Sequence, residues 1–374
     1  MKTKNTCCLI FVFLGNSFSI QAADTFPSGY GIKNTTMGGA SIALPYDSLA
    51  PANNPAGLSK VGDRADLSVK IVRAIGHNSY GDENNRNSLN MTSAFPEFGV
   101  SYGVDDKLSI GLAVYGSGLQ AAYEKPIAPN QGLNNLAVHM TSLSISPTVA
   151  YKVSSNVTVG LSPIIQYSTF NAQGFPGVQK KDETAYGVGY KAGLLWDVND
   201  KFSLGAAYSP RIKMSGFDYY KDNILSSSDG RYDIAEQVAL GASFRPVQRV
   251  TIALDYLRYF WKDVDFFKTS GFPNQNVWRL GVAVDVTDKL SLRTGYYYAS
   301  DIFNSESNNQ NFIGPAISTR NYSAGFSYDL PAGYELSAGV ERAVPRNLKG
   351  RGESQGTNID INYGFFLLGV SKKF

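Results

Sequence analysis

One stretch of the chain decides the fold: Val198-Asn199-Asp200-Lys201-Phe202-Ser203-Leu204-Gly205-Ala206-Ala207-Tyr208. Its first part predicts a tight turn, because Asn and Asp between two extended segments are typical of a β-hairpin. In its second part, large apolar residues alternate with small or polar ones. That alternation predicts a β-strand with one apolar face.

The same kind of turn recurs along the chain. Close copies and less uniform versions occupy residues 104–109, 286–291, 153–157, 245–249 and 329–334. Six hairpins supply about twelve strands, and a first strand near Ala65 to Ala74 and a last one ending at Phe374 bring the number to about fourteen. An even number of strands is typical of single-chain membrane barrels. The sequence therefore predicts an all-β fold, a transmembrane antiparallel β-barrel of about 14 strands.

The connections between these hairpins are longer and polar. They lie near residues 75–93, 117–136, 171–183, 215–231, 262–276, 300–317 and 344–358. Short turns on one rim and long loops on the other are typical of an outer-membrane barrel, in which the short turns face the periplasm. Alternation predicts that Trp278 and Leu280 face lipid, and that Tyr208 and Ile212 share an outward face opposite Arg211.

The last strand alternates Phe366, Leu368, Val370, Lys372 and Phe374. Pairing it with the first strand removes both sheet edges, as a bilayer requires. An aromatic C-terminus after such alternation resembles the signal that the outer-membrane assembly machinery reads, although Lys372 stands where an aromatic is usual. We expect this machinery, outer-membrane lipid and lipopolysaccharide as partners.

The first 22 residues predict a cleaved secretory signal peptide. Lys2 and Lys4 precede the apolar run 7–14, and Ala22 ends the segment. Both cysteines, Cys7 and Cys8, lie within it, so we expect no disulfide and no thiolate metal site. The signal holds two of the 34 Lys and Arg residues and none of the 31 Asp and Glu residues, which leaves a net charge of +1. We expect no metal, no cofactor and no nucleic-acid partner.

Residues 23–62 show neither strand nor helix periodicity, and they are rich in Gly, Pro and small residues. An irregular segment of this length is expected to have a function. A barrel of about fourteen strands has a lumen too wide for its own side chains to fill. We therefore divide the chain into the signal 1–22, an N-terminal hatch, or plug, 23–62 inside the lumen, and the barrel 63–374.

The N-terminal stretch carries Gly29-x-Gly31, Gly38-Gly39-x-Ser41-x-Ala43, Asp47 and Asn54-Pro55-Ala56, followed by about fourteen strands and a terminal Phe. In this order the motifs resemble the FadL family, outer-membrane channels for long-chain fatty acids that include toluene and xylene channels. The resemblance implies that Asn54, Pro55, Ala56 and the adjacent Gly57 form a gate. It also implies that the triplet lies against an inward kink in the third strand, through which an apolar ligand leaves sideways. Glycine within a strand marks bends, so the kink candidates are Gly111, Gly116 and Gly118.

The predicted function is passive uptake of hydrophobic molecules, with long-chain fatty acids first and aromatic hydrocarbons as the alternative. Three arginines expected to point inward, Arg211, Arg279 and Arg293, are candidates for binding a carboxylate. The alternative role of each is an ion pair within the lumen, with Asp255 and Asp285 among the possible partners. The loop 171–183 is short for a fatty-acid channel of this family. Aromatic residues near the loops predict either an apolar entrance for the ligand or a girdle at the membrane interface. They are Phe170, Phe175, Phe217, Tyr219, Tyr220, Phe266, Phe267 and Phe272.

Two other classes compete with this interpretation. A general porin or a surface adhesin would lack a hatch, so ion conductance distinguishes them. An outer-membrane lipase would need a nucleophile beside a histidine. His139 and Thr141 resemble the His-x-Ser pair of such a lipase only faintly, and His77 lies in a predicted loop. We therefore expect that the protein is not an enzyme.

Overall fold

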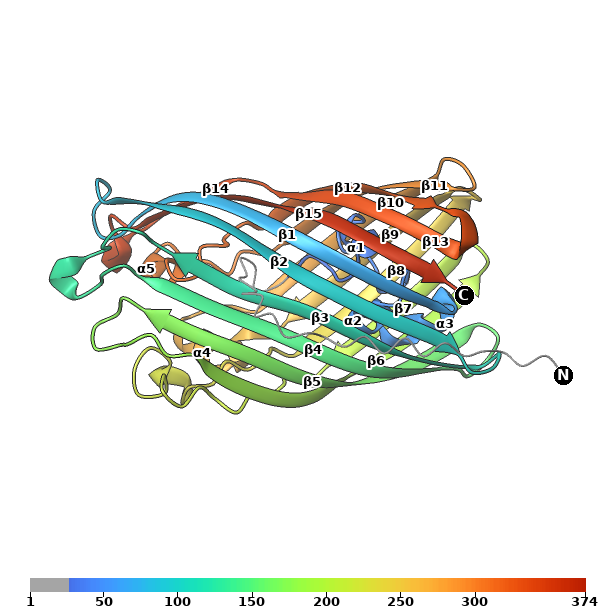
Figure 1. Ribbon diagram of the computed structural model, residues 1–374, viewed down its shortest axis with the longest axis horizontal. Helices are drawn as coiled ribbons and strands as arrows, with labels where there is room; N and C mark the ends of the chain where they lie inside the picture. Colours follow the sequence, from blue (N-terminus) through green and yellow to red (C-terminus); the bar gives the residue numbers. More distant parts are fainter. Residues whose placement is uncertain (1–26) are drawn as a thin grey trace.

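The computed structural model describes residues 27–374, so the predicted signal peptide 1–22 lies outside the described residues. The described chain forms a closed antiparallel β-barrel (Figure 1). Strands pair in chain order, and β1 (Arg64–Ser79) closes the wall against β15 (Asn358–Lys373). The short β14 (Arg346–Lys349) continues β13 (Tyr334–Ala343) along the same partner β15, so the described wall has the predicted fourteen positions.

The remaining strands are β2 (Arg86–Gly103), β3 (Leu108–Ala122), β4 (Ala137–Lys152), β5 (Val157–Gln173), β6 (Glu183–Asn199), β7 (Phe202–Ser209), β8 (Gln237–Val247), β9 (Val250–Tyr259), β10 (Gln275–Asp285), β11 (Leu290–Ala299) and β12 (Arg320–Asp329). The C-terminus and the short turns lie at one end of the barrel (Figure 1). One of these turns contains η5 (Pro331–Gly333). The long connections contain η2 (Pro129–Gln131), η3 (Ser226–Ser228), η4 (Trp261–Asp263), α4 (Asp265–Thr269), α5 (Asn308–Asn311) and η6 (Gly352–Ser354).

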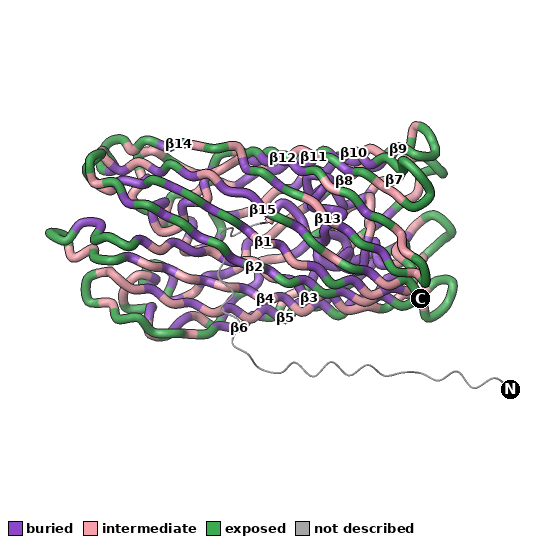
Figure 2. Tube along the Cα trace, turned by 45° about the horizontal axis from the view of Figure 1, so that its top comes forward, coloured by how far each residue is buried: buried purple, intermediate pink, exposed green. Residues whose placement is uncertain are grey.

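Alternation along the strands separates a lipid face from a lumen face, as Figure 2 shows by the regular change between exposed and buried positions. Trp278 and Leu280 are each 45% exposed on the outside, as predicted, whereas Arg279 between them is buried. None of the helices within residues 27–374 is long and apolar enough to cross a membrane.

The prediction failed just beyond β7. Tyr208 faces outward as expected, but Ile212 is 2% exposed and lines the interior, while the Arg211 side chain is partly exposed in a surface cavity. Pro210 explains the error, because it has no backbone N–H and ends the strand at Ser209. Alternation cannot be extended through such a break.

Residues 27–62 lie inside the barrel, toward the end with the short turns (Figure 1). They form α1 (Ile32–Thr35), α2 (Ala50–Asn53), η1 (Pro55–Gly57) and α3 (Leu58–Val61), joined by irregular backbone. Ile32, Ile42, Leu49 and Leu58 are each less than 5% exposed. Burial of these apolar side chains explains why the segment packs within the wall.

A ring of strand glycines makes room for this N-terminal segment. A Cβ atom on any of them would come within 3.0 Å of an atom of residues 32–58. They come from eleven strands: Gly99, Gly111, Gly160, Gly193, Gly205, Gly241, Gly281, Gly295, Gly325, Gly339 and Gly369. Eight of them form four cross-strand pairs in register, such as Gly160 with Gly193. The glycine ring therefore lets the backbone of the N-terminal segment lie directly on the wall.

Candidate functional site

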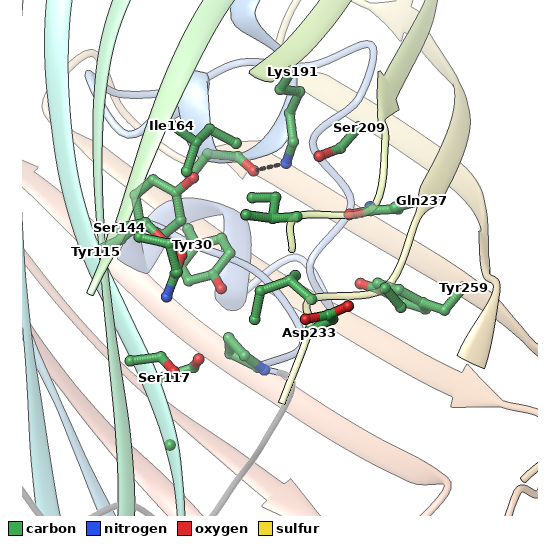
Figure 3. A pocket seen from close by; sticks show the side chains of 18 of the residues that line it. Tyr30, Tyr115, Ser117, Ser144, Ile164, Lys191, Ser209, Asp233, Gln237 and Tyr259 are labelled. Carbon is green, nitrogen blue, oxygen red and sulfur yellow. Dashed lines mark hydrogen bonds between the residues drawn. The ribbon is translucent and has the colours of Figure 1, made fainter. Parts of the chain in front are cut away.

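A cavity of about 110 Å³, which we call the lumen cavity, lies on the loop side of the N-terminal segment. Tyr30, Ile42 and Ala52 of that segment form part of its lining. Strand residues complete the lining. Among them is Tyr115, whose ring centre lies 4.4 Å from the ring centre of Tyr30 (Figure 3). Apolar groups such as Ile164, Ile212 and Met140 alternate there with polar ones such as Ser144 and Gln166. The lining thus suits a ligand with both apolar and polar parts.

Two buried cations line this cavity. The Lys191 ammonium donates a hydrogen bond to the carbonyl of Ala52 at 2.5 Å (Figure 3). The Arg279 guanidinium donates to the carbonyl of Gly39 at 3.3 Å, and its Nε is buried without a hydrogen-bond partner. Within residues 27–374 neither cation has a carboxylate within 4.0 Å. A buried cation is costly without an anionic partner, and the one carboxylate in the described lining, Asp233, lies 4.0 Å from Arg211 and pairs with neither Lys191 nor Arg279.

Only Arg279 of the three predicted arginines lines the lumen cavity. Arg211 lies in a surface cavity with Glu236 and Lys262, where its guanidinium donates to the carbonyl of Asp263. Its Nε also lies 4.0 Å from Oδ2 of Asp233, which lines the lumen cavity, so Arg211 forms an ion pair beside the lumen although Pro210 ends the alternation. Arg293 is buried but lies beside the N-terminal segment, with its guanidinium 5.0 Å from the ring centre of Tyr46. Lys191 was missed, although outward Tyr186, Val188 and Tyr190 give it an inward position.

A second cavity, of about 420 Å³, lies among the long loops, and we call it the loop cavity. Its lining is mainly apolar and contains Phe175, Phe266, Phe267, Phe272 and Phe303. Leu119 and Tyr232 line both cavities, so the two adjoin. The other predicted aromatic residues, Phe170, Phe217, Tyr219 and Tyr220, pack in or against the buried cluster beneath. The predicted loop aromatics therefore face the interior and not a lipid girdle.

The wall is incompletely paired between β2 and β3. Their ladder runs from Gly103–Ser109 only to Phe98–Val114. Farther toward the loops, residues 86–97 stay paired with β1 and residues 115–122 stay paired with β4. A side-chain hydrogen bond from Ser93 to Gln120, 3.2 Å long, links the two edges. Unpaired strand edges are unfavourable in a bilayer, so this β2–β3 gap is a candidate opening.

The candidate glycines of β3 lie on both sides of the point where pairing stops. Gly111 pairs with Ser101 and packs on Leu58. Gly116 and Gly118 lie in the part of β3 that does not pair with β2, and Gly118 lines the lumen cavity. Which of them forms a kink stays a prediction.

The Asn54-Pro55-Ala56 triplet lies elsewhere than the family resemblance implied. It packs on β5 and β6, where a Cβ on Gly160 would lie 2.3 Å from the nitrogen of Ala56, and one on Gly193 would lie 2.0 Å from Oδ1 of Asn54. Asn54 also donates from Nδ2 to the carbonyls of Ile42 and Leu194. Glycine on both neighbouring strands, Gly160 on β5 and Gly193 on β6, lets the backbone of the turn lie against the wall there. Gly57, the fourth predicted gate residue, packs instead on Pro45 and Ala50.

Substitution of Gly193 by Ala is expected to displace this turn. The new methyl group would overlap Asn54, and overpacking of this kind costs about 1–3 kcal/mol. We expect a larger single-channel conductance in planar bilayers. The control is Gly103→Ala, whose Cβ would meet no atom closer than 3.4 Å. Equal conductance of the two variants would contradict the prediction.

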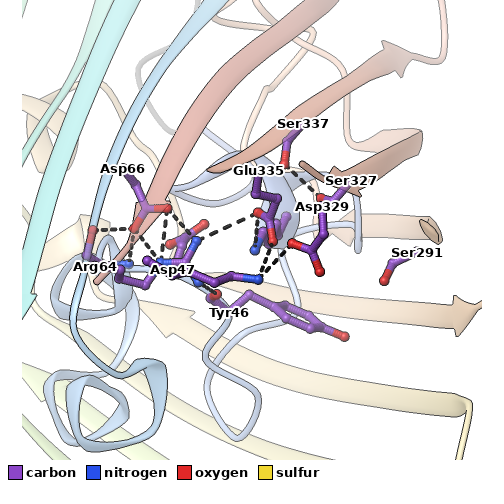
Figure 4. Close-up of polar contacts among 12 residues, drawn as sticks. Tyr46, Asp47, Arg64, Asp66, Ser291, Ser327, Asp329, Glu335 and Ser337 are labelled. Carbon is purple, nitrogen blue, oxygen red and sulfur yellow. Dashed lines mark hydrogen bonds and ion pairs between the residues drawn. The ribbon is translucent and has the colours of Figure 1, made fainter. Parts of the chain in front are cut away.

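Buried charges connect the N-terminal segment to β1 and β13 (Figure 4). The Lys33 ammonium lies 2.5 Å from the Glu335 carboxylate, and the Arg64 guanidinium lies 2.6 Å from Asp66. The backbone N–H of Ser48 donates to the Asp66 carboxylate at 2.8 Å. Asp47 accepts only from the N–H of Leu49 among the described hydrogen bonds. Burial, and then the nearby Asp66 carboxylate, raise the pKa of Asp47 to about 7.

The raised pKa of Asp47 predicts that packing of the N-terminal segment weakens with increasing pH. The stabilisation that the packed segment gains by holding Asp47 protonated is fully present below pH about 3.8. It is lost as the pH rises to about 7. The difference between pKa 3.8 and about 7 corresponds to a loss of at most about 4 kcal/mol in the free energy of packing. We expect faster hydrogen exchange of residues 28–62 at pH 8 than at pH 5, after correction for intrinsic rates. Asp47→Asn should abolish this difference and Asp106→Asn, in an exposed turn, should preserve it. Persistence of the difference in Asp47→Asn would refute the assignment.

His139 does not form a catalytic pair with Thr141. The Thr141 hydroxyl is 2.6 Å from the hydroxyl of Thr169 on the neighbouring strand. No group of three or more His, Cys, Asp or Glu side chains placed to hold a metal ion occurs within the described residues.

Comparison with known proteins gives the family. Residues 17–365 match the family model described as outer membrane protein transport protein (OMPP1/FadL/TodX). The chain belongs to this family. It is therefore an outer-membrane transport protein for hydrophobic molecules. No curated protein sequence matches the chain.

Solved structures of this family share the fold. The P. putida toluene transporter TodX is 17% identical, with a TM-score of 0.73 over 93% of this chain and 99% of TodX. A Pseudomonas aeruginosa FadL homologue is 15% identical, with a TM-score of 0.70 over 92% and 98%. The Ralstonia pickettii toluene transporter TbuX is 16% identical, with a TM-score of 0.68 over 93% and 99%. At these identities the similarity establishes the OMPP1/FadL/TodX barrel and leaves the ligand open.

Proposed function

We propose that this protein takes up long-chain fatty acids by passive diffusion. The acid is captured in the loop cavity and passes to the lumen cavity. A rearrangement of the N-terminal segment, acting as a hatch, then lets it leave sideways into the membrane through the β2–β3 gap. No energy source is needed, because an apolar chain gains about 25 cal/mol for each Å² that it buries.

The pair of buried cations in the lumen cavity carries this proposal. Lys191 and Arg279 both lack a carboxylate partner within the described residues, and both line the cavity beside apolar side chains. A fatty acid supplies the missing charge and an apolar tail in one molecule. Charge-assisted hydrogen bonds to a carboxylate are the strongest polar contacts that such a site offers.

Uptake of a neutral aromatic hydrocarbon is the second candidate. The phenylalanines of the loop cavity favour it, and so does the 110 Å³ of the lumen cavity, which is comparable to an apolar cavity that accepts one benzene molecule. Solved structures named as toluene transporters have the same fold. In this candidate Lys191 and Arg279 do not contact the ligand and serve only to hold the N-terminal segment.

Binding to the purified protein at pH 8 tests the two candidates. The probes are oleate, methyl oleate and toluene. If the cations hold the ligand, oleate binds at least tenfold more tightly than its uncharged methyl ester. Equal affinity for oleate and methyl oleate, together with saturable toluene binding, would replace the first candidate by the second.

Conductance distinguishes transport of hydrophobic molecules from a general porin. With residues 27–62 packed in the lumen, we expect little steady ion current in planar bilayers. A large steady current through the unmodified protein would contradict the proposed hatch. We propose no catalytic step and no adhesin role, and the outer-membrane assembly machinery stays a predicted partner.

A further inference from the structure

Four strands carry an arginine on their lipid-facing side, nearer to the loops than to the short turns. In β1, β9, β12 and β13, four outward apolar or aromatic side chains come first when counted from the short turns, and an arginine follows. In β13, for example, Tyr334, Leu336, Ala338 and Val340 precede Arg342. The four residues are Arg73, Arg258, Arg320 and Arg342.

These arginines lie at the level of the outer leaflet. Each is eight or nine residues from the short-turn end of its strand. At about 3.3 Å per residue and a tilt of about 40°, that is about 20–23 Å across the membrane. The apolar band of such a barrel is about 25 Å tall, and its short turns face the periplasm. The guanidinium groups are therefore at the outer boundary of the apolar band, where lipid headgroups begin.

Arg73 and Arg342 form a pair across a glycine. Both are in register with Gly364 of β15, one from each side, so their Cα atoms are two strand spacings, or about 10 Å, apart. The Arg342 side chain lies over Gly364, with its Cδ 3.4 Å from the position that a Cβ would take. The Arg73 guanidinium donates to the hydroxyl of Thr92 at 2.8 Å. Gly364 has no side chain, so the Arg342 side chain lies across β15, toward the strand that carries Arg73.

Arg320 extends the site on the next strand. Tyr322, two residues from Arg320, is in register with Arg342. The Arg320 guanidinium lies 5.9 Å from the ring centre of Tyr298. Exposed tyrosines therefore adjoin the arginines, and rings of this kind pack well on sugars and headgroups at a membrane boundary.

The charge of these arginines is not balanced by the protein. Among residues 27–374, none of the four has a carboxylate within 4.0 Å, and the Nε of Arg258 is buried without a partner. Glu341, the neighbour of Arg342 in the sequence, points into the lumen and accepts a hydrogen bond from the Ser28 hydroxyl. Arginine binds phosphate through two parallel hydrogen bonds, so a phosphate group matches both the charge and the geometry.

We propose that Arg73, Arg342 and Arg320 bind the phosphate groups of lipopolysaccharide, the phosphorylated glycolipid of the outer leaflet. Arg73 and Arg342 hold one phosphate above Gly364, and Arg320 contacts the same headgroup from β12. Tyr298 and Tyr322 lie under its sugar. The site is on the outer surface of the barrel and is independent of the ligand that passes through the lumen.

Binding of purified lipid A to the full-length protein in detergent tests this proposal. Arg73→Gln with Arg342→Gln should lower the affinity for lipid A at least tenfold. Arg249→Gln with Lys372→Gln removes the same charge from the periplasmic rim and should leave the affinity unchanged. Lipid A lacking its phosphates should bind the unmodified protein no better than intact lipid A binds the arginine variant.

Three results would overturn the proposal. They are unchanged affinity in the arginine variant, equal binding of dephosphorylated lipid A, and displacement of lipid A by millimolar inorganic phosphate, which would indicate a site for free phosphate. Heat-modifiable migration in electrophoresis verifies that each variant has a closed barrel. The assay does not measure oleate uptake. Failure of the lipid A prediction would therefore leave the proposed function unaffected.

Discussion

A covalent bridge between β2 and β3 is expected to stop uptake while the barrel stays folded. Ser93 and Gln120 face each other across the β2–β3 gap at 3.2 Å, and the sequence beyond residue 8 contains no cysteine. Ser93→Cys with Gln120→Cys, joined by a short bifunctional thiol reagent, fixes the two edges together. If the ligand leaves through this gap, oleate uptake by cells should fall at least tenfold. Oleate binding to the purified protein should stay unchanged, because the lumen cavity is intact.

A matched pair in the paired wall serves as control. Ser327 and Ser337 are in register on β12 and β13, with their hydroxyls 2.7 Å apart. The same reagent on Ser327→Cys with Ser337→Cys should leave uptake unchanged, and reduction of cleavable bridges should restore uptake in the β2–β3 variant. Uptake that continues through a bridged β2–β3 gap would show that the ligand leaves past the N-terminal segment into the periplasm.

Replacement of Lys191 by Met is expected to separate acidic from neutral ligands. A hydrogen bond to a charged group contributes about 1.5–3 kcal/mol, which corresponds to a loss of about 10- to 100-fold in oleate affinity. Affinity for toluene should change less than threefold, because the apolar lining is preserved. Lys191→Gln keeps a donor for the Ala52 carbonyl and so distinguishes loss of charge from loss of that contact.

Arg249→Met provides the comparison for Lys191→Met. Its side chain is exposed in a short turn and pairs with the exposed Asp288, so both affinities should stay unchanged. An equal loss of oleate and toluene in Lys191→Met would mean that Lys191 acts by holding the N-terminal segment in place. Unchanged oleate affinity would remove the cation pair as the basis of the proposed function.

The barrel was predictable because its determinants are local. Turns such as residues 198–203 and strict alternation set the strands and their outward faces, and each signal spans only a few residues. The same reasoning failed at Pro210, where one missing N–H ended a strand and placed Ile212 inside instead of outside. An alternation pattern holds only as long as the strand continues.

The site was less predictable because it depends on contacts between distant segments. Nothing near Asn54 in the sequence indicates that its turn meets Gly160 and Gly193 and not β3. Lys191 could have been found from the outward tyrosines beside it. Its proximity to Ala52, and the absence of a carboxylate near it, emerge only when the lumen is assembled.

The glycine ring also bears on the order in which the protein is assembled. The ring is built by strands from β2 to β15, and Gly369 lies five residues from the C-terminus. Residues 27–62 precede all of these strands in the chain, yet their complete binding surface exists only after β1 has paired with β15. The part of the described chain that is synthesised first can therefore complete its packing only after the last strand is in place.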